Sequence, residues 1–209
     1  MAIQTRRGAK IWEDRLQEIT RRDRQNLEEG AVTETYKANK DQVIQLLNRA
    51  RASEWTAFMQ YWHHYFMSTD MHSPEIKQIF KRHADNELDH INEIGERIQL
   101  LGGVPANKPE EIIELWPTSV DYGHDLRSMV EEDLIDERVT VSFYSEIVRF
   151  CGFDDNVTRT MFEEILAEEE GHANELADVL YAYDASTNQR IPSLHEDIEQ
   201  KAASARKVA

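Results

Sequence analysis

The sequence predicts an all-α protein: an antiparallel four-helix bundle with one long crossover between its second and third helices and an extension at each end. Three observations support this fold class. The 209 residues include only 8 Gly and 5 Pro, helix-type periodicity of the apolar residues dominates, and no stretch alternates apolar and polar residues as a strand does. A chain of this length is expected to form one domain with a sizeable core.

The chain divides into three expected parts: an N-terminal extension of residues 1–40, the bundle of residues 41–185, and a C-terminal tail of residues 186–209. In the N-terminal extension, residues 1–8 are expected to be disordered. Residues 9–30 are expected to form a polar helix with Trp12, Leu16 and Ile19 on one face. In the tail, residues 193–196 resemble a capping box that opens a short helix.

Local signals set the expected ends of the bundle helices. Asp41 can cap the first helix, which should run to about Ser68. Ser73 and Pro74 provide a cap and a first-turn proline for the second helix, which should stop at the glycine pair of residues 102–103. The remaining expected elements are a crossover of residues 104–122 with short helical turns over 108–115, a third helix over 122–150 and a fourth over 155–183.

Four of the expected helices carry a matched set of metal-binding side chains. Two helices carry a lone inward Glu, and two carry Glu-x-x-His, whose members share one helix face because they lie three residues apart. The six residues are Glu54, Glu87, His90, Glu137, Glu169 and His172. Four carboxylates and two imidazoles are a mixed oxygen and nitrogen set suited to a pair of iron or manganese ions.

The spacing of these residues predicts that they meet. Glu54 and Glu87 are 33 residues apart, and their midpoint falls in the helix break of residues 68–74. Glu137 and Glu169 are 32 residues apart, and their midpoint falls in the break of residues 151–156. Residues equidistant from the turn of an antiparallel helix pair lie at about the same height, so each hairpin sets its lone Glu level with its Glu-x-x-His.

Each of these ligands also interrupts an apolar stripe, and charges that face a core are costly unless they are paired or bind metal. A single Glu-x-x-His arises easily by chance in an acidic helical chain, and we interpret the near-match Asp121-x-x-His124 as surface. On the third helix Asp133, Asp136 and Glu137 are all candidates. Glu137 is favoured by its stripe and height, with Asp133 in reserve.

The roles of several neighbouring side chains remain open. Tyr61 lies two turns after Glu54 on the same face, where it can hydrogen-bond a ligand, donate an electron, or simply pack. His83 lies one turn before Glu87; we expect it to be solvated near the bundle end, with a contact to a ligand as the alternative. The aromatic side chains of Trp62 and Phe66 are expected to be exposed and to mark a subunit interface. The histidines at positions 63, 64 and 72 are interpreted as structural.

Charge and cysteine content restrict the partners and the location. The net charge of −16 is uneven: residues 1–40 hold nine Lys/Arg and seven Asp/Glu, which leaves −18 on the remainder. An acidic body attracts cations and repels nucleic acid. The N-terminal extension can touch DNA, although a solvated or subunit-docking arm is favoured. The lone Cys151 excludes an internal disulfide framework, and no apolar run could span a bilayer, so we expect a cytoplasmic protein.

Residues 164–172 (Glu-Ile-Leu-Ala-Glu-Glu-Glu-Gly-His) and 86–90 (Asn-Glu-Leu-Asp-His) resemble motifs of the ferritin-like di-iron carboxylate family. The similarity is greatest to bacterioferritin and to bacterioferritin-like (Dps-like) mini-ferritins, and it covers about residues 41–182. It implies that Glu54 and His90 bind one metal, that Glu137 and His172 bind the other, that Glu87 and Glu169 bridge, and that Tyr61 adjoins the site.

The resemblance also implies an activity. The expected function is that of a ferroxidase that oxidises Fe(II) with O2 or H2O2, for iron storage and protection from oxidative stress inside a hollow homo-oligomer of 12 or 24 subunits. Each subunit would hold two iron ions within itself, with manganese or zinc as substitutes. The rivals are another di-metal enzyme, such as a manganese catalase or a quinone hydroxylase, and a DNA-binding protective shell.

Two departures from the bacterioferritin pattern are visible. Leu88 stands where bacterioferritin has the methionine that ligates haem, so haem is not expected. The crossover of residues 104–122 is also longer than in bacterioferritin and leaves room for a short helix as in mini-ferritins.

Overall fold

The computed structural model describes residues 2–27, 30, 32–69, 73–117 and 122–187. Within these ranges the chain forms helices and no strand, which confirms the predicted all-α class. In chain order the elements are α1 (Ala2–Asp23), α2 (Lys40–Met67), α3 (Ser73–Leu100), α4 (Pro109–Leu115), α5 (Leu126–Cys151) and α6 (Asn156–Thr187). None of the described helices is both long enough and apolar enough to cross a bilayer.

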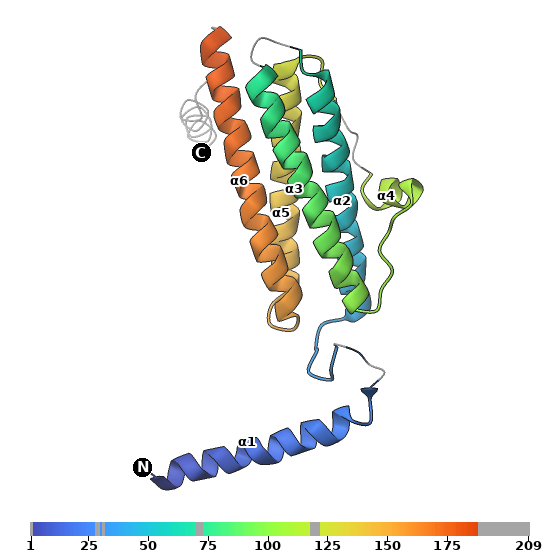
Figure 1. Cartoon of the computed structure of the whole chain (residues 1–209), viewed down its shortest axis with the longest axis vertical. Helices are drawn as coiled ribbons and strands as arrows, with labels where there is room; N and C mark the ends of the chain where they lie inside the picture. Colours follow the sequence, from blue (N-terminus) through green and yellow to red (C-terminus); the bar gives the residue numbers. More distant parts are fainter. Residues whose placement is uncertain (1, 28–29, 31, 70–72, 118–121, 188–209) are drawn as a thin grey trace, which may run out of the picture.

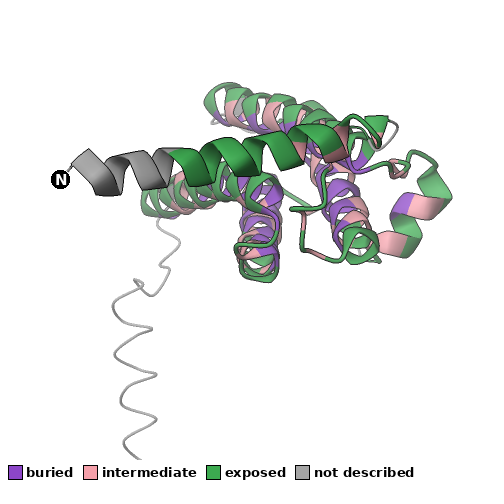
Figure 2. Ribbon diagram, turned by 90° about the horizontal axis from the view of Figure 1, so that it is seen from below, coloured by how far each residue is buried: buried purple, intermediate pink, exposed green. Residues whose placement is uncertain are grey.

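Helices α2, α3, α5 and α6 lie side by side as an antiparallel bundle (Figure 1). Helix α2 packs mainly on α3, and α5 packs mainly on α6, so the bundle consists of two hairpins. The crossover from α3 to α5 contains α4, which packs on the outer face of α2 (Figure 1). Seen from below, the buried residues of the four helices face one another and the exposed residues face outward (Figure 2).

The bundle has two apolar core clusters with a polar layer between them. One cluster contains Leu47, Ile98 and Phe162 and lies toward the turn between α5 and α6. The other contains Phe80 and Leu176 and lies toward the opposite end. On every bundle helix, the metal-binding candidates fall between the residues that contribute to the two clusters. The apolar clusters therefore shield a central polar layer from solvent at both ends of the bundle.

The structure corrects two of the predicted helix starts. The cap of α2 is Asn39, whose Oδ1 accepts a hydrogen bond from the backbone N–H of Gln42 at 3.1 Å. Asp41 lies instead in the first turn, where its charge favours the positive end of the helix dipole. Helix α5 begins at Leu126, not at residue 122, because Asp125 and Ser128 form a reciprocal capping box.

The predicted stop of α3 at the glycine pair has a clear physical basis. Gly102 has a φ of 79°, in the left-handed region that only glycine adopts without strain. Its N–H donates to the carbonyl of Gln99 at 2.8 Å, and the N–H of Gly103 donates to that of Ile98 at 2.9 Å. This pair of bonds is a Schellman motif, which satisfies the last carbonyls of the helix.

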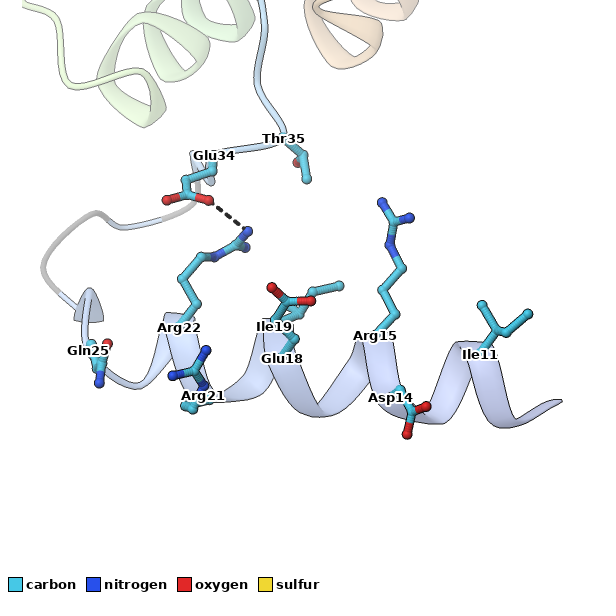
Figure 3. A pocket seen from close by; sticks show the side chains of 10 residues that line it. All are labelled: Ile11, Asp14, Arg15, Glu18, Ile19, Arg21, Arg22, Gln25, Glu34 and Thr35. Carbon is cyan, nitrogen blue, oxygen red and sulfur yellow. Dashed lines mark hydrogen bonds and ion pairs between the residues drawn. The ribbon is translucent and has the colours of Figure 1, made fainter. Parts of the chain in front are cut away.

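Helix α1 stands apart from the bundle, below it and across its long axis (Figure 1). It runs from Ala2 to Asp23, so the prediction of disorder before residue 9 and of helix to residue 30 was wrong at both ends. Trp12 is 64% exposed, as befits a helix with no bundle surface against it. Figure 3 shows Arg22 and Arg15 pointing into a hollow of about 630 Å³ between α1 and residues 34–35.

The segment between α1 and α2 is attached to the end of the bundle. The Tyr36 hydroxyl donates to Asp155 Oδ2 at 2.9 Å, and Val32, Tyr36 and Ala38 pack against the core. Arg97 donates to the same carboxylate, at Oδ1, at 2.8 Å, so the start of α6 joins the connector to α3. The tail motif of residues 193–196 lies outside the described residues, as do His72 and Asp121.

Candidate metal centre

The structure brings all six candidate ligands into one cluster at mid-height in the bundle. Helix α2 contributes Glu54, and α5 contributes Glu137; α3 contributes Glu87 with His90, and α6 contributes Glu169 with His172. None of the six is more than 8% exposed. The matched spacing within each hairpin thus produces the predicted meeting of the four helices.

Two overlapping sets of potential ligands share two carboxylates. One set is Glu54, Glu87, His90 and Glu169, and the other is Glu87, Glu137, Glu169 and His172; within each set the ligand atoms lie within 4.8 Å of one another. Glu87 places Oε2 3.4 Å from His90 Nδ1 and Oε1 3.4 Å from His172 Nδ1. Glu169 likewise places Oε1 3.1 Å from His90 Nδ1 and Oε2 3.1 Å from His172 Nδ1.

The other two carboxylates each belong to one half of the cluster. Glu54 Oε2 lies 3.5 Å from His90 Nδ1, and Glu137 Oε1 lies 3.4 Å from His172 Nδ1. Two shared and two unshared carboxylates are the arrangement that suits a pair of cations held close together.

Four buried polar atoms of this cluster make no hydrogen bond within the described part of the chain: both carboxylate oxygens of Glu87, Nδ1 of His90 and Oε1 of Glu169. Buried polar atoms in proteins almost always have partners. All four atoms belong to residues of the two ligand sets. The donor set and its unsatisfied atoms therefore fit a pair of divalent transition-metal ions.

Burial and mutual repulsion hold protons in the metal-free cluster. Burial, with the charges of Glu169 and Glu54, raises the pKa of Glu87 well above its usual range. Burial and the charge of Glu169 raise the pKa of Glu137 to about 7. Burial lowers the pKa of His172, but bonds to Glu137, Glu169 and Glu87 outweigh it and raise that pKa to about 12. The pKa of His90 is raised for the same reasons.

Two buried tyrosines bind the unshared carboxylates from across the bundle. Tyr61 on α2 donates its hydroxyl proton to Glu137 Oε1 on α5, and Tyr144 on α5 donates to Glu54 Oε1 on α2. Each tyrosine lies seven residues after the Glu of its own helix. The cluster therefore has approximate two-fold symmetry. The contact of Tyr61 was among the open alternatives, whereas the role of Tyr144 was not predicted.

His83 breaks this symmetry. The expectation that it is solvated was wrong: it is fully buried, and its ring stacks on that of His172 with centroids 4.0 Å apart. Its Nδ1 lies 3.1 Å from the Tyr61 hydroxyl, and its Nε2 lies 2.8 Å from Glu175 Oε2. The corresponding position on α6, four residues before Glu169, is the apolar Ile165. Tyr61 is thus connected through His83 to Glu175 at the surface, whereas in the other half His90 Nε2 lies 3.2 Å from Oε2 of the exposed Glu168.

Asp133, the reserve ligand on α5, has other partners. It is buried, but it lies 2.9 Å from His64 Nδ1 and accepts from Gln60 Nε2 at 3.0 Å. Asp133 and the half-buried Asp136 are absent from both ligand sets, which contain Glu137. Sequence reasoning missed Gln60 because its partners lie on another helix.

His124 belongs to the near-match Asp121-x-x-His124 that was interpreted as surface, and it is exposed as expected.

Comparisons with known proteins agree with this arrangement. The family profile described as a ferritin-like domain matches residues 44–184. The bacterioferritin of Desulfovibrio desulfuricans is 34% identical over 134 residues, which span 64% of this chain and 71% of that protein. Its structure, described as showing the diiron site in different catalytic states, superposes with a TM-score of 0.62 over 72% of this chain and 84% of that one.

Two further relatives extend the comparison. A dodecameric thioferritin, the bacterioferritin-related protein of Bacteroides fragilis, superposes with a TM-score of 0.70 at 30% identity, over 74% of this chain and 94% of that one. A nutrient stress-induced DNA-binding protein of Synechococcus is 30% identical over 66% of this chain and 81% of that protein. The match of the family profile, together with these relatives, shows that the chain belongs to the ferritin-like family.

Proposed function

We propose that this chain is a cytoplasmic ferroxidase that oxidises Fe(II) at a two-metal site within one subunit and retains the product inside a hollow homo-oligomer. The observation that carries the proposal is the pair of ligand sets with shared Glu87 and Glu169. In this assignment Glu54 and His90 would hold one ion, Glu137 and His172 would hold the other, and the two shared carboxylates would contact both. Manganese or zinc can occupy the same ligands.

The chemistry that the iron supplies is one electron per Fe(II). Two Fe(II) ions reduce O2 to H2O2 with two protons, or reduce H2O2 to two waters with two protons. The protein holds the ligands in place: Tyr61 and Tyr144 fix the unshared carboxylates, and the apolar layers on both sides limit access of water. Electron donation by Tyr61 stays a prediction.

Surface properties support the oligomer and the storage role. Phe66 is 60% exposed near one end of α2, whereas Trp62, which was also expected to be exposed, is half-buried. Exposed aromatic side chains on a bundle with a filled core mark interfaces. A charge of −18 on residues 41–209 attracts Fe(II) to an inner wall. We therefore propose a closed assembly of 12 or 24 subunits; the long crossover and the dodecameric relative favour 12.

Aerobic addition of Fe(II) to purified protein tests the proposal. We expect a ferric absorbance that elutes with a particle at least about ten times the mass of one chain, in line with closed homo-oligomers. A Glu54→Ala/Glu137→Ala double variant should oxidise Fe(II) far more slowly because each ion loses its unshared carboxylate. Protein that releases all of its iron would refute storage, and rapid O2 release from H2O2 would favour a catalase.

A DNA-binding shell is the second candidate. A relative is named as DNA-binding, and α1, which stands apart from the bundle, carries exposed basic side chains such as Arg15 and Arg21. A gel-shift assay should compare the full chain with a variant that lacks residues 1–31, which keeps the Tyr36 attachment to the bundle. Retardation of DNA by the full chain alone would support this candidate, and no retardation by either would exclude it.

A further inference from the structure

A second group of oxygen-bearing side chains adjoins the metal centre between α2 and α5. A cavity of about 10 Å³, close to the smallest that holds one water, is lined by cluster carboxylates on one side. On its other side it is lined by Gln60 of α2 and by Asp133 and Asp136 of α5. These three residues belong to neither ligand set of the two-metal centre.

Gln60 holds an unsatisfied oxygen at this cavity. The side chain is 1% exposed, and its Nε2 donates to Asp133 Oδ1 at 3.0 Å and to Asp136 Oδ2 at 2.7 Å. Its Oε1 makes no hydrogen bond within the described residues, although it is buried. The reverse amide orientation would set this oxygen against two carboxylates, so the hydrogen bonds fix the assignment of the two atoms. A buried acceptor without a donor calls for a partner, and a bound cation is one such partner.

Within this group of side chains, burial increases from the surface toward the metal cluster. Asp136 is half-buried, whereas Asp133 is fully buried one turn before Glu137. Asp133 is held in place by His64, whose Nε2 donates to the backbone carbonyl of Tyr122 at 3.1 Å. The oxygen atoms are therefore held by hydrogen bonds, and they line the same cavity between α2 and α5 as the cluster carboxylates.

On the opposite side of the bundle, the route through His83 is less suited to the passage of a cation. There, His83 leads to Glu175 at the surface, but the guanidinium of Arg82 forms an ion pair with that carboxylate. A positive charge at this position repels a divalent ion. No described side chain of Lys or Arg lines the cavity beside Gln60.

We propose that Gln60, Asp133 and Asp136 form a transit site for one divalent cation, which binds there on its way between α2 and α5 into the two-metal centre. The inference rests on the proposed function, since the path leads to that centre. The three residues offer amide and carboxylate oxygen but no imidazole. Such a site suits small hard divalent ions and binds them more weakly than the centre, whose two histidines add nitrogen ligands.

The test follows the loading of Co2+ into metal-free, full-length protein by stopped-flow absorption, with equilibrium stoichiometry measured separately. Asp136→Asn and Gln60→Leu should each slow loading by about tenfold, the usual effect of removing a group that supports a metal site. Both variants should still bind two ions per chain at equilibrium. Asp136→Glu, which keeps a carboxylate, should load faster than Asp136→Asn.

Two matched controls locate the effect. Glu175→Gln removes a negative charge on the α3–α6 side, and Glu146→Gln removes one from an exposed position on α5; both should load at the wild-type rate. Wild-type loading in the Asp136→Asn variant, or slow loading only in Glu175→Gln, would overturn the proposed path. A stoichiometry below two in Asp136→Asn and Gln60→Leu would make these residues part of the centre. Failure of the wild-type protein to bind two ions would instead refute the proposed function.

Discussion

Loading two Zn2+ ions onto the metal-free protein should release about three protons per chain near pH 8. Zn2+ is a useful probe because it binds the same ligand types without redox change. To coordinate two ions, the cluster must present ionised carboxylates and free imidazole nitrogens. The protons held by the metal-free cluster must therefore leave as the ions bind.

The number follows from the pKa shifts. His90 and His172 are protonated in the metal-free state because the surrounding carboxylates raise their pKa values, that of His172 to about 12. We expect Glu87 to hold the third proton, because burial and its neighbours raise its pKa well above its usual range. The pKa values of Glu54 and Glu169 are lowered in spite of burial by hydrogen bonds from their neighbours, so these carboxylates are ionised before and after loading.

The same shifts fix the pH dependence. Protons are bound in the free state and not in the loaded state, so the affinity for metal must rise with pH. Near pH 8 the product of the two binding constants should rise by about three powers of ten per pH unit, and near pH 6 by about four. The extra proton at the lower pH belongs to Glu137, whose pKa is about 7.

Isothermal titration calorimetry in two buffers of different ionisation enthalpy measures the released protons directly. Glu87→Gln removes one proton-holding group, so its release should fall by about one proton. Glu175→Gln removes a carboxylate outside the cluster and should release as many protons as the wild type. Release of fewer than about one proton, or an affinity independent of pH, would refute the protonated cluster.

Three further predictions concern single substitutions and bound cofactors. Arg97→Met should lower the free energy of unfolding by about 3–5 kcal/mol, because it leaves the buried carboxylate of Asp155 without its guanidinium; chemical denaturation that shows equal stability would contradict this. Tyr61→Phe and Tyr144→Phe should each weaken metal binding by about 10–100-fold, measured by chelator competition, because each frees an unshared carboxylate; unchanged affinity would show that the hydroxyls do not position the ligands. The absorption spectrum should lack a haem band with two thioether ligands, because Leu88 has no lone pair to offer iron; a stoichiometric band would disprove this.

The parts of the site that could be predicted from the sequence are those with a periodic signature. The equal spacing of Glu54 from Glu87 and of Glu137 from Glu169 determines the heights of the ligands, because hairpin geometry converts distance along the chain into height. The glycine stop of α3 was predictable for a similar reason, since only glycine relieves the strain of the left-handed turn.

The surroundings of the ligands could not be predicted in the same way. Tyr144, Gln60 and His83 have partners on other helices, and which side chains meet across a bundle depends on how its helices pack. His83 stands one turn before Glu87 on the same face, so its burial had a periodic signal that was given too little weight. The cap of α2 is Asn39 and not the predicted Asp41. Several polar residues there can cap a helix, and the local sequence does not choose among them.

The division of the bundle into two hairpins bears on how the chain folds. The α2–α3 hairpin carries Glu54, Glu87 and His90, and the α5–α6 hairpin carries the other three ligands. Each hairpin can form through contacts that are local along the chain, whereas docking of the hairpins must close the crossover and bring four carboxylates together. Cations at the centre therefore act on the docking step and not on the formation of either hairpin. The availability of metal during synthesis then governs how long the two halves remain apart, with their apolar faces open to aggregation.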